Sequence, residues 1–523
     1  MLDSARPPEL LRPEVAVARR AGRRSAGGEV LCAGVACCLS LALLLLPGCK
    51  DDRAEEDLYG TSVQGSGLYP ALDVRGGDCD AQISTGVRTI FEGNGGTGGT
   101  ISVTSTGGRV SVNVGAAPAP PALSFPAPAD PTAVIDVLPG QSQTVSGYRA
   151  LDWLRVQAGG TLRVAGDSVL SVTGDVEISG KVESAVSEDS IRGKNLTLVA
   201  GGSILIQGTL SANGFTKDER RAARPDLYAG GDGGAIRLQC NAGGIHIAQG
   251  GAVVADGGRT YSSDGFFAAA GSGGSIRLET TATVVVAGRI SARGGEAYTT
   301  ATGYEGEGGA ISIEAQGDVE FYNAAEWNAT GGSASGSLAG AGGSVTVQAS
   351  TAIDLEALDI QALGGGATYF LNAEAGPGGQ VTLEGPTVRL SDVRVDVSGG
   401  SGKLRGSSAG AVARLGGLGA QGGSIEITGS TLYLGDGSGG ELPIELRSGG
   451  GRTTTFGATG ASGGEIRLVG GGTFLFEGAA AVPGGPSEDG IEGLPGTVCA
   501  TGASDAVRLK IGGTSGTIPE DCS

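Results

Sequence analysis

The single histidine of the 523-residue chain, His246, is the first candidate for acid–base chemistry, because imidazole titrates near neutral pH. It lies between Ile245 and Ile247, and apolar residues two apart on a strand share the inward face. The ring is therefore expected to point outward. An isolated outward histidine is usually a solvated surface group, so no catalytic role is predicted for it.

Carboxylates at outward positions are the second candidate, because two of them could act as general acid and base. Glu279 stands two residues after Arg277 on one expected strand, and Arg237 and Glu314 belong to the neighbouring repeats. Stacked repeats would place the two arginines together, and the glutamates could relieve their repulsion. The pattern predicts a surface ladder of ion pairs worth about 0–1 kcal/mol each. No catalytic residue is predicted.

A metal site is the third candidate, because the segment Gly230–Gly234 with Asp232 invites comparison with calcium-binding nonapeptide repeats. Such repeats need an aspartate at a fixed place in tandem copies, and Asp232 is not repeated in the neighbouring units. No metal ligand and no cofactor are predicted. Loose calcium binding by the acidic surface is the most that we expect.

Cys49 is the residue with the clearest expected chemistry. A basic cluster at residues 19–24 precedes an apolar stretch from Val30 to Leu46, which ends in Leu46-Pro47-Gly48-Cys49. This order of charge, apolar core and small residue is typical of a secretory signal. The tetrapeptide resembles the bacterial lipobox, which implies removal of residues 1–48 and lipidation of Cys49. An uncleaved membrane helix is the alternative reading of the apolar stretch.

The lipid would hold the chain on a membrane. Lys50 follows Cys49, so the aspartate that marks retention at the inner membrane in enteric-type sorting is absent from that place. In a bacterium with two membranes, we expect the outer membrane or the cell surface. The sequence leaves the orientation across the envelope open.

The charge balance excludes one class of partner. The signal region contains six of the 36 Lys and Arg and four of the 55 Asp and Glu, so the exported part carries 30 basic against 51 acidic side chains. A surface this acidic repels phosphate backbones. No nucleic-acid binding is predicted.

Gly-Gly-x-φ-x-φ, where φ is apolar, is the repeated motif that organises the chain. Seven copies follow one another at spacings of 34 to 44 residues, and the 101 glycines are expected to form turns between many short strands. The seven glycine pairs are Gly233-Gly234, Gly273-Gly274, Gly308-Gly309, Gly342-Gly343, Gly378-Gly379, Gly422-Gly423 and Gly463-Gly464.

Each repeat contains three short stretches in which apolar residues alternate, which is the period of a strand with one buried face. A unit this small cannot bury its apolar face alone, so stacking of neighbours is expected. The sequence predicts an all-β, right-handed parallel β-helix of glycine-rich three-strand coils, with long loops on one side. A β-propeller is the competing architecture, but its blades need four strands. The unit after Gly274 shows the pairs Ile276/Leu278, Val284/Val286 and Ile290/Ala292.

On these residues, the chain resembles the right-handed β-helices of the pectin-lyase-like superfamily. That resemblance implies polysaccharide lyase or glycoside hydrolase activity as one possible function. The acidic calcium-ligand cluster of the lyases and the paired Asp, His-Gly and Arg-x-Lys segments of the hydrolases are absent from the sequence. The resemblance therefore predicts architecture more firmly than activity.

The loops after the third strand of each repeat collect aromatic residues. Loops that leave the same corner of successive coils must stack on one side, which predicts an aromatic ridge. The rings either pack on one another or form a binding surface for polysaccharide or a partner protein. The candidate binding residues are Tyr261, Phe266, Phe267, Tyr298, Tyr304, Tyr369, Phe370 and Phe456.

Four cysteines follow Cys49, an even number in an oxidising compartment, and they allow three pairings. A bridge between Cys499 and Cys522 would close a C-terminal loop and stabilise it by about 3 kcal/mol. Cys240 continues the inward positions of its strand, and either a bridge or a buried free thiol fits it.

The expected organisation is a signal peptide (1–48), a lipid-anchored tether (49–78), a small β segment with a proline-rich linker (79–133), a parallel β-helix (134–487) and a C-terminal cap (488–523). The function expected first is that of a lipid-anchored cell-envelope structural or binding protein, adhesin-like or glycan-binding, without catalysis. Its partners would be the membrane, through the lipid, and a polysaccharide or another envelope protein. The alternative is a β-helix polysaccharide lyase or glycoside hydrolase.

Overall fold

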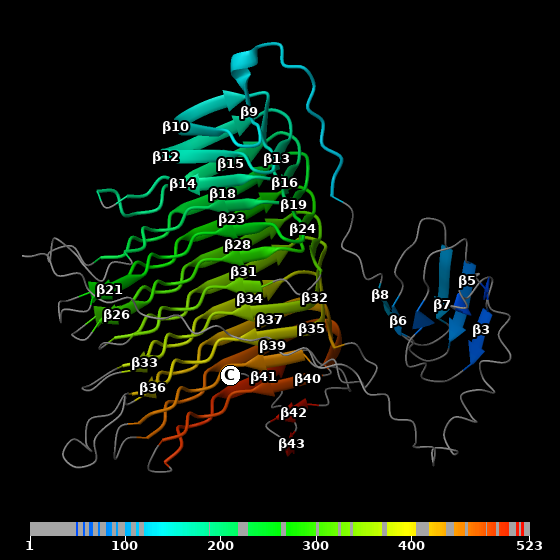
Figure 1. Cartoon of the computed structure of the whole chain (residues 1–523). Coiled ribbons are helices and arrows are strands. Elements are labelled where there is room, and N and C mark those ends of the chain that lie inside the picture. Colours follow the sequence, from blue (N-terminus) through cyan, green and yellow to red (C-terminus); the bar gives the residue numbers. More distant parts are fainter. Residues whose placement is uncertain are drawn as a thin grey trace, which may run out of the picture.

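Short strands return to the same place once in every repeat, and the computed structural model of the chain shows them as a parallel β-helix (Figure 1). The structure describes residues 120–501 except 188, 218–228, 263–267, 300–302, 323–325, 335–337, 369–373, 404–417, 436–443, 455–458, 477 and 488–490, together with isolated strands outside that range. Three parallel ladders of strands run the length of the solenoid. The expected all-β fold with stacked three-strand coils is confirmed.

The first ladder begins each coil after the glycine pair. Its strands pair in register, and Ile236, Ile276 and Ile311 follow one another on the inward face. Its members are the ends of β10 (Ser142–Leu151) and β12 (Thr161–Val172), then β15 (Leu196–Ala200), β18 (Ala235–Cys240), β23 (Ser275–Thr280), β28 (Ala310–Ala315), β31 (Ser344–Ala349), β34 (Gln380–Glu384), the starts of β37 (Ser424–Leu434) and β39 (Glu465–Phe476), and β41 (Thr497–Thr501).

The second ladder follows a short turn. It consists of β9 (Val134–Val137), β11 (Trp153–Val156), β13 (Val176–Ile178), β16 (Ile204–Ile206), β19 (Ile245–Ile247), β24 (Val284–Val286), β29 (Val319–Phe321), the starts of β32 (Ala352–Gln361) and β35 (Thr387–Asp396), and the ends of β37 and β39. The third ladder consists of the starts of β10 and β12, β14 (Lys181–Ser184), β17 (Thr209–Ser211), β20 (Ala252–Val254), β25 (Arg289–Ser291), β30 (Glu326–Asn328), the ends of β32 and β35, β38 (Ile444–Arg447), β40 (Gly478–Ala481) and β42 (Leu509–Ile511).

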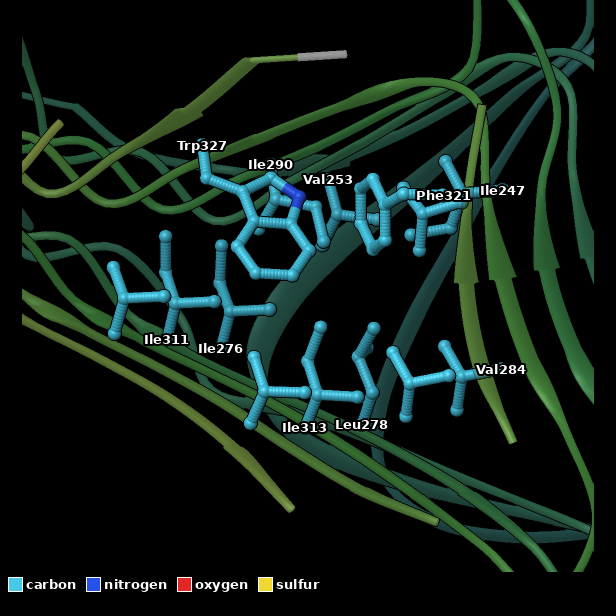
Figure 2. Packing of buried hydrophobic residues seen from close by; sticks show 14 of the residues in the cluster. Ile247, Val253, Ile276, Leu278, Val284, Ile290, Ile311, Ile313, Phe321 and Trp327 are labelled. Atoms are coloured by element: carbon cyan, nitrogen blue, oxygen red, sulfur yellow. The ribbon is translucent and has the colours of Figure 1, made fainter. Parts of the chain in front are cut away.

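The core is a continuous stack of apolar side chains from the three ladders (Figure 2). Ile290 lies in register with Trp327, and the indole of Trp327 meets the ring of Phe321 edge to face at 4.2 Å between centroids. Both aromatic residues are almost fully buried. Burial stabilises each such side chain by roughly 1.5–3 kcal/mol, so the stack holds coils that are individually too small to fold.

The long loops between the third and first ladders form one stacked structure, which we call the loop fin (residues 212–234, 255–274, 292–309, 329–343, 362–379, 397–423, 448–464 and 482–496, where described). Within each loop the returning limb donates to the outgoing limb, as Gly271 does to Gly258 at 3.1 Å. Between loops, the outgoing Gly295 donates to the returning Gly271 of the preceding loop at 2.8 Å. The limbs therefore share a continuous backbone hydrogen-bond ladder.

This ladder explains the glycine content better than turns do. A β-carbon on Gly332 would stand 1.9 Å from the carbonyl oxygen of Gly295, so only glycine lets the two limbs approach. The expectation that glycines mainly form turns is wrong for the fin, because close contact between backbones requires them there. Among the described glycines, a left-handed φ occurs at Gly140, Gly147, Gly159, Gly250 and Gly435.

The proline-rich segment before the first coil lies along the second ladder. The ring of Phe125 meets Trp153 edge to face at 5.4 Å, and the Trp153 indole N–H donates to the Pro126 carbonyl at 2.9 Å. The Ser124 N–H donates to a carboxylate oxygen of Asp175 at 2.8 Å. A 3₁₀ turn, η1 (Pro131–Ala133), with its N-cap at Asp130, then leads into β9.

Further strands lie outside the main solenoid residues. β3 (Ser62–Gly65), β5 (Asp80–Thr85) and β7 (Thr100–Ser105) pair in parallel, as do β4 (Leu72–Asp73), β6 (Ile90–Glu92) and β8 (Ser111–Asn113). β1 (Cys49–Lys50) pairs antiparallel with β2 (Glu56–Asp57), and β42 with β43 (Thr514–Gly516). β41 adds a strand to the first ladder beyond residue 487.

Candidate functional site

The arginine–glutamate ladder lies on the outward face of the first ladder, as the sequence predicts. Arg237 and Arg277 are in register on β18 and β23. Glu279 forms ion pairs with both arginines, and the pair with Arg237 measures 2.6 Å. Arg277 also binds both carboxylate oxygens of Glu314 at 3.0 Å. Both glutamates form ion pairs with arginine. A general acid and a general base would instead face each other across a space for the substrate.

His246 does not lie in solvent, and that expectation is wrong. Its side chain alternates with inward Ile245 and Ile247 as predicted, but only 5% of its surface is exposed. Leu205, its register partner in the preceding coil, is equally buried. The outward positions of β16 and β19 are therefore covered. Burial lowers the pKa of His246 because the protonated ring loses hydration, so the ring is neutral at neutral pH.

Two of the predicted loop aromatics come together in the fin. Tyr261 of β21 (Thr260–Ser262) lies in register with Tyr298 of β26 (Ala297–Thr299), and 47% of Tyr298 is exposed. The backbone of Tyr304 in β27 (Gly303–Tyr304) pairs with Ala269 of β22 (Ala268–Ala269). A parallel pair farther along the fin joins β33 (Ala367–Thr368) and β36 (Gly402–Lys403). Phe266, Phe267, Tyr369, Phe370 and Phe456 lie outside the described residues.

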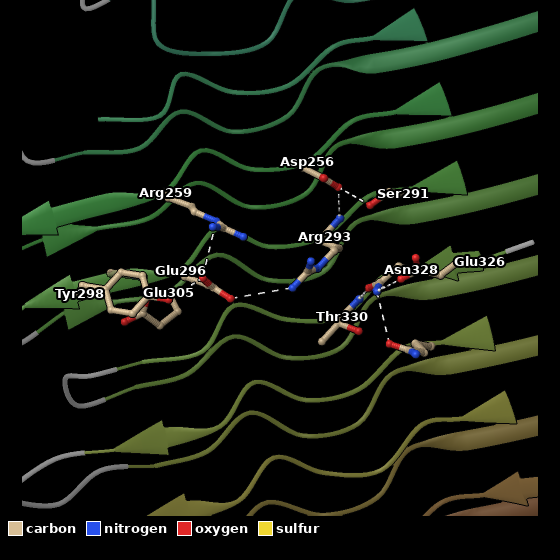
Figure 3. A network of polar contacts seen from close by, with 12 residues as sticks. Asp256, Arg259, Ser291, Arg293, Glu296, Tyr298, Glu305, Glu326, Asn328 and Thr330 are labelled. Carbon is tan, nitrogen blue, oxygen red and sulfur yellow. Dashed lines mark hydrogen bonds and ion pairs between the residues drawn. The ribbon is translucent and has the colours of Figure 1, made fainter. Parts of the chain in front are cut away.

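Tyr298 belongs to a polar cluster on the outgoing limbs (Figure 3). Its hydroxyl donates to Glu296 at 2.8 Å, and this hydrogen bond raises the pKa of Tyr298. Glu296 also forms ion pairs with Arg259 of the preceding coil at 3.6 Å and with Arg293 at 3.9 Å. The cluster fixes the exposed tyrosine relative to two coils.

Glu305 crosses from the returning limb to the outgoing limb of the same loop, where its carboxyl oxygen Oε2 accepts a hydrogen bond from the Ala297 N–H. Its other oxygen is buried and has no hydrogen-bond partner among the described atoms. Burial raises the pKa of Glu305 to about 9, and the charge of Glu296 acts in the same direction. Glu305 is therefore protonated at neutral pH. It has no counterpart in the repeat pattern, so sequence reasoning missed it.

A second polar network joins the third ladder to the base of the fin (Figure 3). Asp256 accepts hydrogen bonds from the Ser291 hydroxyl at 2.6 Å and from the Arg293 N–H at 2.8 Å. One coil farther on, Asn328 accepts from the Thr330 N–H at 3.0 Å. These contacts satisfy backbone groups where the chain leaves the sheet and turns into the fin.

A groove of about 950 Å³ follows the solenoid axis where the first ladder turns into the second; we call it the axial groove. One wall consists of outward residues at the strand ends: Gln239, Glu279, Glu314, Gln348, Glu384 and Thr428. The opposite wall consists of exposed turn residues: Asn241, Thr281, Gln316, Ser350, Pro386 and Ser430. Small residues form the floor: Cys240, Thr280, Ala315, Ala349, Gly385 and Gly429. The groove was not predicted from the sequence, although most of its wall residues are polar and recur at equivalent positions of successive repeats.

The structure decides between the two alternatives for Cys240, a disulfide bridge and a buried free thiol. Cys240 is a free thiol and is 2% exposed, and burial raises its pKa to about 12. Cys499 is buried and disulfide-bonded. Cys522 lies outside the described residues, so the Cys499–Cys522 pairing stays a prediction. Lipidation of Cys49 also stays a prediction, because the structure describes only its backbone in β1.

Within the described residues, no group of three or more His, Cys, Asp and Glu side chains is arranged to hold a metal ion. The same part of the chain contains no helix long and apolar enough to cross a membrane. No protein-family model, no curated protein and no solved structure matches the chain.

Proposed function

We propose that the chain is a lipid-anchored cell-envelope protein whose loop fin binds an envelope glycan or a partner protein, without catalysis. The observation that carries this proposal is the in-register pair of Tyr261 and Tyr298 on a fin whose limbs share backbone hydrogen bonds. A binding surface needs exposed rings that are already ordered, because ordering them on binding costs affinity. The fin provides this order through its backbone.

Tyrosine suits such a surface because its ring offers flat apolar area and its hydroxyl offers a hydrogen bond. Tyr298 exposes about half of its surface, and its hydroxyl is oriented by Glu296. Successive loops repeat at about 4.8 Å along the axis, so neighbouring rings would contact consecutive parts of one extended ligand.

The membrane anchor in this proposal rests on the lipobox-like sequence that ends at Cys49. A lipid on Cys49 followed by a polar tether would hold the solenoid near a membrane while leaving its sides accessible. We also propose an outer-membrane or cell-surface location, because Lys50, and not an aspartate, follows the cysteine.

Catalysis is left out of the proposal because Glu279 and Glu314, which are register partners on adjacent coils, are both paired with Arg277. Glycoside hydrolysis needs one carboxyl group protonated and the other ionised across the scissile bond. Glu279 and Glu314 instead share one guanidinium, so neither carboxylate faces an open space between them.

The test is a glycan array and an envelope pull-down with the full-length chain in detergent, combined with a reducing-sugar assay. The double variant Tyr261→Ala/Tyr298→Ala should lower the bound signal by about tenfold, the loss expected for a stacked aromatic pair. Tyr148→Ala is the matched control, because Tyr148 is 68% exposed on β10, away from the fin. Equal binding by both variants would show that the fin tyrosines are not the binding site. Release of reducing ends would show that the chain cleaves the glycan, which contradicts the proposal.

A further inference from the structure

The axial groove is a second surface, separate from the fin. Each first-ladder strand begins beside the fin and ends at the groove, as β23 does between Ser275 and Thr280. Six residues of strand span roughly 17–20 Å, so one ligand segment cannot contact both places on the same coil. The groove and the fin tyrosines are therefore separate surfaces of the same coils.

The axial groove is lined by a row of small residues between two rows of larger ones. Its floor consists of small residues, of which Cys240, Thr280, Ala315 and Ala349 are buried. Larger residues line this floor on both sides, one residue before it and one residue after it, and all those named are polar except Pro386. Residues two apart on an extended chain are about 6.6 Å apart, so the walls are close enough to contact the same chain from both sides.

The register of the coils repeats these polar groups along the axis. Glu279, Glu314, Gln348 and Glu384 are consecutive register partners on four successive strands. Successive groups are therefore about 4.8 Å apart, and the wall from Gln239 to Thr428 extends about 24 Å. A long row of hydrogen-bonding groups at a fixed interval suits an extended polymer with repeating polar groups.

The charges in the groove select against an anionic polymer. The described residues that line it include three glutamates and no Lys, Arg or His. Two of those glutamates, Glu279 and Glu314, form ion pairs with Arg237 and Arg277, and Glu384 accepts a hydrogen bond from the Gln348 amide at 2.9 Å. The remaining surface offers amide, hydroxyl and paired carboxylate groups. These groups bind hydroxyl-rich, uncharged ligands, whereas uronates and phosphodiesters would meet unfavourable charge.

We propose that the axial groove binds a linear, uncharged polysaccharide that lies along the solenoid axis. The chain rests on the small floor residues, and its hydroxyl groups exchange hydrogen bonds with both walls. Gln348 and Glu384 are central contacts because both side chains are exposed and each joins the other across neighbouring coils.

The test measures binding of defined hexasaccharides to the full-length chain by titration calorimetry. The uncharged probes are cellohexaose, maltohexaose and the chitin hexamer; hexagalacturonate is the anionic probe and the chitosan hexamer the cationic one. At least one uncharged probe should bind with a Kd below about 1 mM. The double variant Gln348→Ala/Glu384→Ala should weaken that binding by at least about tenfold, since it removes a pair of hydrogen-bonding groups together.

Thr346→Ala/Thr382→Ala is the matched control, because these two residues are register partners on the same strands and lie one outward row away from the groove. It should bind the uncharged hexasaccharides as the unchanged chain does. The inference is overturned if no uncharged hexasaccharide binds, if only a charged probe binds, or if the Gln348/Glu384 variant binds like its control.

Discussion

Gly306 and Gly271 of adjacent loops lie so close that a β-carbon on Gly306 would stand 1.8 Å from the carbonyl oxygen of Gly271. The obstructing atom is backbone that is itself held by the fin, since the Gly271 N–H donates to Gly258 and its carbonyl accepts from Gly295. A side chain at Gly306 therefore cannot be accommodated by a rotamer change. The fin must shift in several layers at once.

Gly306→Ala is predicted to destabilise the chain by about 3 kcal/mol, the upper range for overpacking, because rigid backbone opposes the added methyl group. The measurement is the urea midpoint of the full-length chain. Gly166→Ala is the control, because a β-carbon there meets only the Ser146 side chain at 3.7 Å. It should change the free energy of unfolding by no more than about 0.5 kcal/mol. Equal midpoints for the two variants would contradict the close-packing explanation.

Arg277→Met is predicted to lower the free energy of unfolding by about 1 kcal/mol or less, even though Arg277 pairs with both Glu279 and Glu314. Arg277 is about half exposed, so water and salt screen its ion pairs. The loss should shrink when the urea midpoint is measured at high salt. Arg467→Met provides the comparison. Arg467 lies 3.9 Å from Glu426, so its replacement should lower the free energy of unfolding by less than the replacement of Arg277 does. A large loss of stability that does not depend on salt would contradict this prediction, because screened ion pairs could not account for it.

Glu305→Gln is predicted to stabilise the chain at alkaline pH relative to acidic pH. The folded-state pKa of Glu305 is raised to about 9, above its unfolded value, so the folded state holds its proton more tightly. Stability from this group is present below the unfolded pKa and is lost as pH rises toward about 9. The neutral glutamine removes this loss and keeps an oxygen for the Ala297 N–H.

The measurement is the urea midpoint of each chain at pH 5 and pH 9. From pH 5 to pH 9, the free energy of unfolding of the variant should rise relative to that of the unchanged chain by at least about 1.4 kcal/mol, the equivalent of one pKa unit. Glu307→Gln is the control, because Glu307 is exposed on the same returning limb. The explanation by burial fails if the two variants show the same pH dependence.

The repeated part of this fold could be predicted from sequence because each of its features follows from a short period. Ile276 and Leu278 alternate on one strand, and the repeat length fixes their register with Ile311 and Ile313. Both the buried face and the stacking could therefore be predicted. The ion pairs of Arg277 followed from the same register, because outward residues two apart meet their counterparts in the next coil.

The remaining features depend on contacts that no local period records. The outward position of His246 was predictable, but its burial depends on what covers that face. A Gly-Gly pair looks the same in a turn and in the fin, and the difference lies in a neighbouring loop about 40 residues away. Glu305 occurs once, so only the folded loop reveals that its carboxyl group is buried beside Ala297.

Cys240 is predicted to be unreactive toward thiol reagents in the folded chain. Its thiol is 2% exposed on the inward face of β18, and burial raises its pKa to about 12, so almost no reactive thiolate forms at neutral pH. The measurement is iodoacetamide labelling followed by peptide mass spectrometry. The same peptide should label fully after denaturation in guanidinium. Labelling in the folded chain at the denatured rate would show that the coil around Cys240 opens.

Cys49 is predicted to carry the lipid, because it follows an apolar residue and two further residues at the end of a signal-like stretch. Growth with radioactive palmitate should label the unchanged chain, and Cys49→Ala should remove the label and the size shift that follows signal cleavage. Cys37→Ala is the informative control, since Cys37 lies upstream in the same apolar stretch and is removed with the signal if Cys49 is the modified residue. Loss of label in Cys37→Ala, or equal label in Cys49→Ala, would move the anchor away from Cys49. Cell fractionation of the same variants adds a second readout, because an unlipidated and uncleaved chain would keep its apolar stretch and stay with the inner membrane.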